Sequence, residues 1–269
     1  MNKYKLGAIG AGHMGMAMLD AAVREKALAA GEIAVYDLSA KRTDEARERG
    51  FAVLGSEREV FENCVCLFLA VLPQNVETVL TEISKSKNEN DPAIVSIVSG
   101  TGSEYIRGFL GEKARVVCVV PNLGLSVNLG ASAVSRTENV PDEIFNAVVG
   151  LLETTGRVAV AEESLLKEII PANGCAPGYA YYFIDAVATA CEKNGVDYKT
   201  AAEMTAAAFA GAAKLLLESG AGPRELLSKV CSPGGLTAKG IERFDELGVF
   251  GGIAAGTEAS AARGRELAK

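Results

Sequence analysis

Histidine is nearly absent from this chain of 269 residues, and the single one, His13, lies inside a glycine-rich segment. One histidine excludes a Ser/His/Asp hydrolase and a histidine-based zinc site unless His13 itself takes part, and its place among glycines argues against a catalytic role. The six cysteines are scattered, and the only close pair is Cys64 and Cys66. On a strand these two share one face, which is more typical of small core residues than of metal ligands. We therefore expect no metal site and no disulfide.

Basic stripes and long apolar segments are also missing. The formal net charge of −7 and the pI near 5.0 argue against a nucleic-acid surface, because no basic stretch is interleaved with aromatic residues. No apolar run approaches 18 residues and the N-terminus shows no signal-peptide pattern, so we expect a cytoplasmic protein that does not bind membranes.

The first part of the chain alternates apolar, β-rich runs with helical patterns. Strands are predicted at 6–9, 33–36, 65–70, 94–98 and 116–120, and helices at 14–24, 41–49, 76–84 and 103–109. A further unit, with strands at 131–135 and 158–160 around a helix at 142–152, extends the same sheet. Strands that are apolar on both faces indicate a parallel sheet covered by helices, so residues 1–161 are predicted to form a doubly wound Rossmann domain.

From residue 162 onward the strand-like runs disappear and alanine-rich helical patterns take over, at 178–192, 200–218 and 252–268. Pro177, Pro223 and Pro233 each lie where a helix can begin. The fold class is therefore α/β, with the Rossmann domain followed by an all-helical domain over 162–269. Its helices are apolar or small on nearly every face, which favours an obligate homodimer with interleaved helices; the alternative is a monomer with small residues at close helix crossings.

A glycine-rich segment after the first predicted strand has the G-x-G-x-x-G spacing of a dinucleotide-binding turn. It precedes a predicted helix, and an acidic residue follows about twenty residues later at the end of the second strand. The expected cofactor-binding residues of this segment and of that strand end are Gly10, Gly12, His13, Met14, Gly15 and Asp37. A nicotinamide dinucleotide is therefore the expected cofactor.

The choice between NAD and NADP stays open at this point, with a slight lean to NAD. Asp37 would accept hydrogen bonds from ribose hydroxyls and repel a 2′-phosphate. Lys41 and Arg42 could reach such a phosphate, or they could simply form a solvated helix face. Ala70, Val71 and Pro73 follow another strand and are expected near the nicotinamide, because ligands of such sheets bind at the carboxyl ends of the strands.

A second candidate anion site lies near the other end of the chain, at residues 231–237. There a Ser-Pro-Gly-Gly turn leads into a helix and would present backbone N–H groups and hydroxyls to a small anion. Two such sites in one chain indicate a phosphate-bearing cofactor and an acidic substrate.

Three segments in order, residues 10–15, 177–179 and 231–237, together resemble pyrroline-5-carboxylate reductase. The resemblance spans nearly the whole chain, and its most specific part is the block from Ser232 to Thr237. It implies NAD(P)H-dependent reduction of the cyclic imine 1-pyrroline-5-carboxylate to L-proline in proline biosynthesis, by a homodimer formed through the helical domain. Dimers of this family often assemble into rings.

The resemblance also assigns roles to the block. The substrate carboxylate would be held by Ser232, Gly234, Gly235 and Thr237, and Thr237 would lie closest to the imine nitrogen as the catalytic residue. This chemistry suits a chain with few acid–base residues, because a protonated imine accepts hydride without a strong protein acid.

The chain departs from the family pattern near the expected pocket. Family members usually carry lysine at the position of Leu72, Thr-Pro at Leu123 and Gly124, and threonine at Leu236. These changes leave alternatives open: a paralogous reductase of another cyclic imine or of a 2-oxo or 3-hydroxy acid, and a non-catalytic dimer that senses NAD(P).

Overall fold

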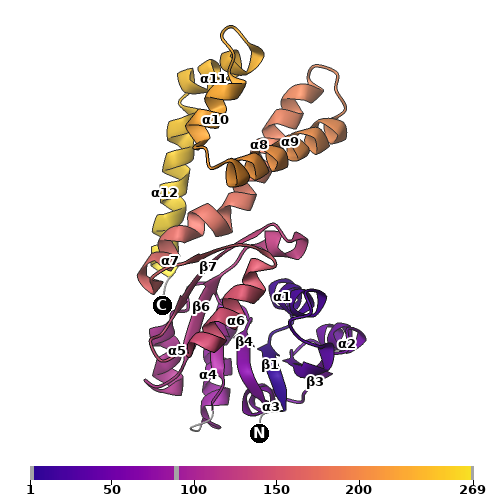
Figure 1. The fold of residues 1–269 in the computed structure, drawn as a ribbon, viewed down its shortest axis with the longest axis vertical. Coiled ribbons are helices and arrows are strands. Elements are labelled where there is room, and N and C mark those ends of the chain that lie inside the picture. Colours follow the sequence, from indigo (N-terminus) through magenta and orange to yellow (C-terminus); the bar gives the residue numbers. More distant parts are fainter. Residues whose placement is uncertain (1–2, 88–90, 268–269) are drawn as a thin grey trace. The chain divides into compact units, whose positions relative to one another are not determined.

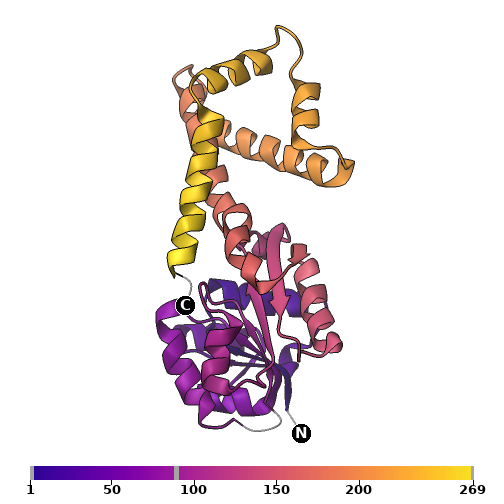
Figure 2. The same ribbon diagram turned by 90° about the vertical axis from the view of Figure 1, so that its left-hand side faces the viewer.

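The computed structural model describes residues 3–87 and 91–267, and it divides the chain into two compact units (Figures 1 and 2). The sheet unit comprises Met1–Cys175 and Ala261–Lys269, and the helical unit comprises Ala176–Ser260. This division falls later than the boundary that the sequence placed at residue 161. The difference arises because helix α7 (Glu163–Ile170) packs against the sheet through the buried Leu166.

The sheet has eight strands in the order β3-β2-β1-β4-β5-β6-β7-β8. Their bounds are β1 (Tyr4–Ile9), β2 (Ile33–Tyr36), β3 (Ala52–Val53), β4 (Cys64–Leu69), β5 (Ala93–Ser96), β6 (Val116–Val120), β7 (Gly130–Arg136) and β8 (Gly156–Val160). All neighbouring strands are parallel except β6 and β7, which are antiparallel because a short connection, η3 (Leu123–Val127), joins them without a crossover helix. The strand order reverses between β1 and β4, which is where such sheets bind ligands.

Helices cover both faces of this sheet. They are α1 (His13–Arg24), α2 (Ala40–Glu48), α3 (Glu57–Asn63), α4 (Val76–Ser84), α5 (Ser103–Leu110), α6 (Asp142–Glu153) and α7, with short turns η1 (Ala30–Glu32) and η2 (Pro73–Asn75). Along β4, Phe68 joins a core cluster with residues of α1 and α6, whereas Leu67 and Leu69 join a cluster with residues of α3, α4 and α5. Alternate residues are therefore buried on opposite faces, which confirms the predicted doubly wound α/β domain. The sequence interpretation missed β3 and α3.

The helical unit contains α8 (Ala176–Glu192), α9 (Tyr198–Ser219), α10 (Pro223–Val230), α11 (Leu236–Glu246) and most of α12 (Val249–Leu267). Pro223 begins α10, as predicted. Pro177 does not open a new helix, because α8 continues directly from α7 through the π-helical segment η4 (Pro171–Cys175). Pro233 lies in the turn before α11 rather than at its first position. No helix within 3–87 and 91–267 combines the length and apolar character that a membrane span needs.

The helical unit lacks a core of its own within one chain. Among its described apolar residues only Ala188 and Ala201 are buried, whereas large side chains such as Tyr182, Met204 and Phe250 are exposed. Small residues at the few buried positions let α8 and α9 approach each other closely, but they bury little area. The larger apolar side chains of this unit remain available to another surface.

Candidate functional site

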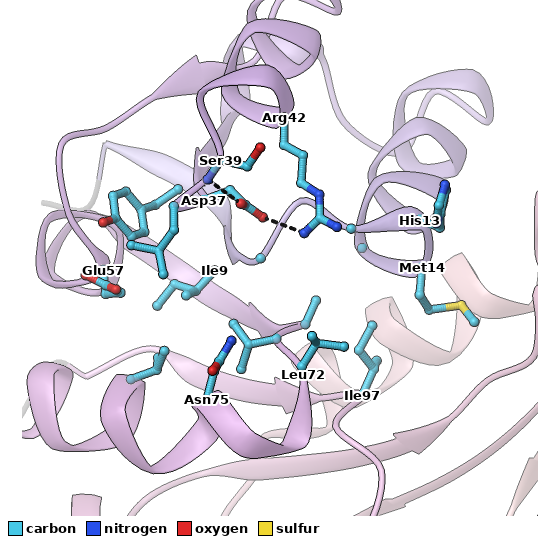
Figure 3. Close-up of a pocket in the computed structure, with 18 residues that line it drawn as sticks. Ile9, His13, Met14, Asp37, Ser39, Arg42, Glu57, Leu72, Asn75 and Ile97 are labelled. Carbon is cyan, nitrogen blue, oxygen red and sulfur yellow. Dashed lines mark hydrogen bonds and ion pairs between the residues drawn. The ribbon is translucent and has the colours of Figure 1, made fainter.

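A cavity of about 680 Å³ lies at the strand reversal between β1 and β4 (Figure 3). Its walls come from the glycine loop after β1, the end of β2 with the start of α2, and the segment after β4. Among the residues expected to bind the cofactor, the following line it: Gly10, Gly12, His13, Met14, Gly15, Asp37, Ala70 and Val71. Pro73, the first residue of η2, is not part of the lining, although its neighbour Leu72 is.

The three glycines of the loop serve different purposes. Gly10 has φ +97°, and a Cβ there would lie 2.5 Å from the carbonyl oxygen of Ala70. A Cβ on Gly15 would lie 2.6 Å from the carbonyl oxygen of Gly10. Gly12 has an ordinary φ of −70°, and its Cβ would only contact the Arg42 guanidinium, at 3.7 Å. Gly10 and Gly15 are therefore required for the packing of the loop, whereas Gly12 leaves room at the cavity.

Asp37 joins the glycine loop to the turn before α2. Its Oδ2 accepts a hydrogen bond from the backbone N–H of Ala11 at 2.7 Å, and its Oδ1 accepts one from the N–H of Ser39 at 2.8 Å. The nearest nitrogen of Arg42 is 3.4 Å from Oδ2, and the Asp37 side chain is only 8% exposed. Burial, together with the negative charges of Glu57 and Asp37, raises the pKa of the neighbouring Tyr36. The carboxylate is thus held by backbone donors on both oxygens.

Other residues also line this cavity. Two of them, Arg42 and Leu72, were placed near the cofactor or the pocket by the sequence. The others were not expected from the sequence, and they are Ile9, Tyr36, Leu38, Ser39, Glu57, Asn75, Val79 and Ile97. Most lie at carboxyl ends of strands or in the turns that follow them. The edge itself was predictable from the parallel sheet, but the particular side chains were not, because they depend on how the strand ends align.

The start of α5, which follows β5 at the same edge, is occupied by a side chain of the protein. Glu163 of α7 accepts hydrogen bonds from the backbone N–H and the hydroxyl of Ser103, both at 2.6 Å. A carboxylate at a helix N-terminus is stabilised by the free N–H groups there. This helix start is therefore filled from within and does not present an open anion site.

Two asparagines connect the end of β6 to the π-helical segment. Asn122 donates to the carbonyl of Asn173 at 2.9 Å, and the buried side chain of Asn173 donates to the carbonyl of Val120 at 2.6 Å. The Oδ1 of Asn122 accepts from the N–H groups of Gly124 and Ala131. The network holds η4 to the sheet, and π-helical segments of this kind occur frequently at functional sites.

The predicted substrate-binding block lies in the helical unit. The N–H of Gly235 donates to the carbonyl of Ser232 at 2.9 Å, and Gly234 has φ +72°, so residues 232–235 form a tight turn. Gly235 is the N-cap of α11, and within the described chain no side chain caps that helix start. Thr237 is exposed in the first turn of α11. This turn therefore leaves N–H groups and hydroxyls available at a helix N-terminus.

Comparisons with known proteins cover both units. Residues 5–100 match the family "NADP oxidoreductase coenzyme F420-dependent", and residues 163–267 match the family "Pyrroline-5-carboxylate reductase dimerisation". The chain is 31% identical to the pyrroline-5-carboxylate reductase of Escherichia coli (strain K12) over 245 residues, which are 91% of each chain. The chain belongs to the pyrroline-5-carboxylate reductase family.

Other members of the pyrroline-5-carboxylate reductase family support this assignment along the full length. The enzyme of Aquifex aeolicus is 31% identical over 249 residues, 93% of this chain and 92% of that one. The solved structure of a pyrroline-5-carboxylate reductase from Coxiella burnetii superposes with a TM-score of 0.92 at 25% identity and covers 100% of both chains. The family assignment made from three sequence segments is therefore confirmed.

Proposed function

We propose that this chain reduces 1-pyrroline-5-carboxylate to L-proline with NADPH or NADH. The observation that carries the proposal is the 31% identity over 91% of both chains to a pyrroline-5-carboxylate reductase, because a match of that length includes both units. The glycine-lined cavity at the strand reversal fits a dinucleotide, since Gly12 leaves its backbone open and α1 begins directly behind it.

The reaction needs one hydride and one proton. A nicotinamide cofactor held at the glycine-lined cavity would supply the hydride to the imine carbon. The electron pair of the C=N bond moves to nitrogen, which carries the proton, so that a secondary amine results. Because a protonated imine is already a good electrophile, the protein can act mainly by positioning and electrostatics.

The turn before α11 is the proposed substrate-binding segment. Free N–H groups at a helix start stabilise a carboxylate, and the hydroxyls of Ser232 and Thr237 add donors beside them. We assign Thr237 the role of holding the imine nitrogen, either directly or through a water molecule. Gly234 and Gly235 give the turn its shape: Gly234 has a positive φ, and a Cβ on Gly235 would lie 2.6 Å from the hydroxyl oxygen of Ser232.

We also propose that the chain forms a homodimer through the helical unit and that dimers assemble into rings. The near absence of buried apolar residues in this unit supports the dimer, because such helices gain stability only when a second surface covers their apolar side chains.

Another cyclic imine is the second candidate substrate. Leu72 lines the cavity, and Leu236 at the start of α11 is 95% exposed. Both add hydrocarbon where the family usually carries a polar side chain, which favours a larger or more apolar ring.

The test is a turnover assay of the purified protein with NADPH or NADH and either 1-pyrroline-5-carboxylate or its six-membered homologue. We expect turnover with the five-membered imine, and Thr237→Ala should lower kcat by about 10- to 1,000-fold while leaving cofactor affinity unchanged. Thr237→Ser keeps the hydroxyl and should retain most of the activity. Turnover of the six-membered imine alone would favour the second candidate, and cofactor binding without any turnover would refute both.

A further inference from the structure

A second cavity, of about 470 Å³, adjoins the first, and Gly12, His13, Ser39 and Arg42 border both. The two cavities differ in charge. The charged lining of the first is Asp37, Glu57 and Arg42. The charged lining of the second is Arg24, Lys41, Arg42, Arg49, Asp20 and Glu45. The first cavity therefore has more acidic than basic groups, and the second has the reverse.

Most of these basic groups already have partners. Arg49 lies 3.1 Å from Asp20, and Arg24 donates to Asn128. Arg42 differs, because within residues 3–87 and 91–267 its one polar side-chain contact is with Asp37 at 3.4 Å, near the upper limit for a hydrogen bond. A guanidinium has five N–H donors, so Arg42, which is 47% exposed, keeps donors for another group.

Arg42 also lies at the boundary between the cavities. Its guanidinium is within contact distance of a Cβ placed on Gly12, and Figure 3 shows it extending from α2 toward the glycine loop, between Asp37 and His13. A substituent on the ribose of a nucleotide bound at this loop would therefore meet Arg42 when it enters the basic cavity.

Asp37 is poorly placed to oppose such a substituent. An acidic residue at the end of the second strand usually selects NAD by accepting hydrogen bonds from ribose hydroxyls. Here both carboxylate oxygens accept backbone N–H groups, and the side chain is almost buried. Its negative charge is partly neutralised by these dipoles and by Arg42.

We propose that Arg42, with Lys41 and Ser39 beside it, holds a 2′-phosphate, so that this chain prefers NADPH although the motif residue is aspartate. Asp37 then acts as a positioning residue that fixes the glycine loop. This inference rests on the proposed use of a dinucleotide. It concerns a choice that the sequence left open with a lean to NAD.

The test uses nucleotide halves, which bind without any turnover. Binding of 2′,5′-ADP and of 5′-AMP is measured by isothermal titration calorimetry at low ionic strength. The two ligands differ only in the 2′-phosphate. The unmodified protein should bind 2′,5′-ADP at least about 10-fold more tightly, because charge-assisted hydrogen bonds to phosphate have this strength. The difference should shrink as salt is added.

Arg42→Ala should weaken 2′,5′-ADP binding by roughly 10- to 100-fold and change 5′-AMP binding little. Arg47→Ala is the matched control, since Arg47 lies on the same helix, pairs with Asp44 at 2.6 Å and lines neither cavity. It should leave both affinities unchanged. Arg42→Lys keeps the positive charge but not the planar guanidinium, and it should weaken 2′,5′-ADP binding by an intermediate amount.

Three outcomes would overturn the inference. Equal affinity of the unmodified protein for the two ligands would remove the proposed preference. If Arg42→Ala weakened the binding of 2′,5′-ADP and of 5′-AMP equally, Arg42 would only support the loop in general. If Arg47→Ala weakened 2′,5′-ADP binding as much as Arg42→Ala does, the role of Arg42 would be reduced to long-range charge. Failure to bind either nucleotide would instead refute the proposed use of a dinucleotide.

Discussion

Alanine substitutions in the glycine loop should rank differently by their effect on stability and by their effect on cofactor affinity. Alanine is placed in turn at Gly10, Gly12 and Gly15. At Gly10 the new residue must adopt φ +97°, which costs about 1–2 kcal/mol, and its Cβ would lie 2.5 Å from a backbone oxygen that cannot move aside. We expect Gly10→Ala to lower the free energy of unfolding by at least about 2–3 kcal/mol.

Gly15 lies inside α1, where alanine is intrinsically about 1 kcal/mol better than glycine. A Cβ there would be 2.6 Å from the carbonyl oxygen of Gly10, and the resulting shift costs roughly 1–3 kcal/mol, so a net loss of stability of about 1 kcal/mol is expected. In Gly12→Ala the new Cβ makes only an ordinary contact at 3.7 Å. Alanine is a weaker N-cap than glycine, but it also lowers the conformational entropy of the unfolded chain. Because these two effects oppose each other, the free energy of unfolding should change by less than about 0.5 kcal/mol.

Cofactor binding should follow a different order. At Gly12 the added methyl group occupies the space through which the backbone approaches the pyrophosphate, so NADPH affinity should fall by roughly 10-fold or more. The assays are thermal unfolding, in which 1 kcal/mol corresponds to about 2–4 °C in a chain of this size, and fluorescence titration with NADPH. Normal NADPH binding by Gly12→Ala, or a loss of stability as large as that of Gly10→Ala, would refute this reasoning.

Two further predictions concern the helical unit and its connection to the sheet. Phe250→Glu places a charge at an exposed apolar position of α12 and should weaken the dimer by roughly 2–3 kcal/mol, measured by sedimentation. Lys199→Ala, at a position whose side chain is 82% exposed, is the control and should leave the dimer unchanged. An unchanged dimer in Phe250→Glu would place Phe250 outside the interface. Asn173→Ala removes the buried amide that donates to the carbonyl of Val120 at 2.6 Å, and it should lower the free energy of unfolding in urea by about 1–3 kcal/mol. Asn173→Asp also lacks this donor and should be no more stable. Stability equal to that of the unmodified protein in either variant would show that the network contributes little.

Much of the candidate cofactor site could be predicted from the sequence, because its residues follow directly from local pattern. The glycine spacing after an apolar strand specifies a turn and a helix start, and Asp37 stands at the end of the next strand. All of these residues line one cavity in the structure. The roles of Ser232, Gly234, Gly235 and Thr237 remain predictions, and they rest on a turn that the sequence also anticipated.

The antiparallel β7 and the π-helical segment could not be predicted in this way. Strand direction depends on the length and path of the connection, which here is the short η3 instead of a crossover helix. Pro177 looked like a helix start, but the helical conformation of η4 is held by Asn122 and Asn173, which are 51 residues apart. No local pattern contains that contact.

The sequence by itself determined the order of most strands and helices, the glycine loop and the family, because each depends on periodicity, backbone freedom or short motifs within a few residues. Tertiary structure decided which partner each polar side chain has. It directs the carboxylate of Asp37 to two backbone N–H groups, places Glu163 at the start of α5, sixty residues away, and leaves Arg42 between two cavities of opposite charge. Such pairings follow from the packing of distant segments, and they set the electrostatics on which the choice of cofactor depends.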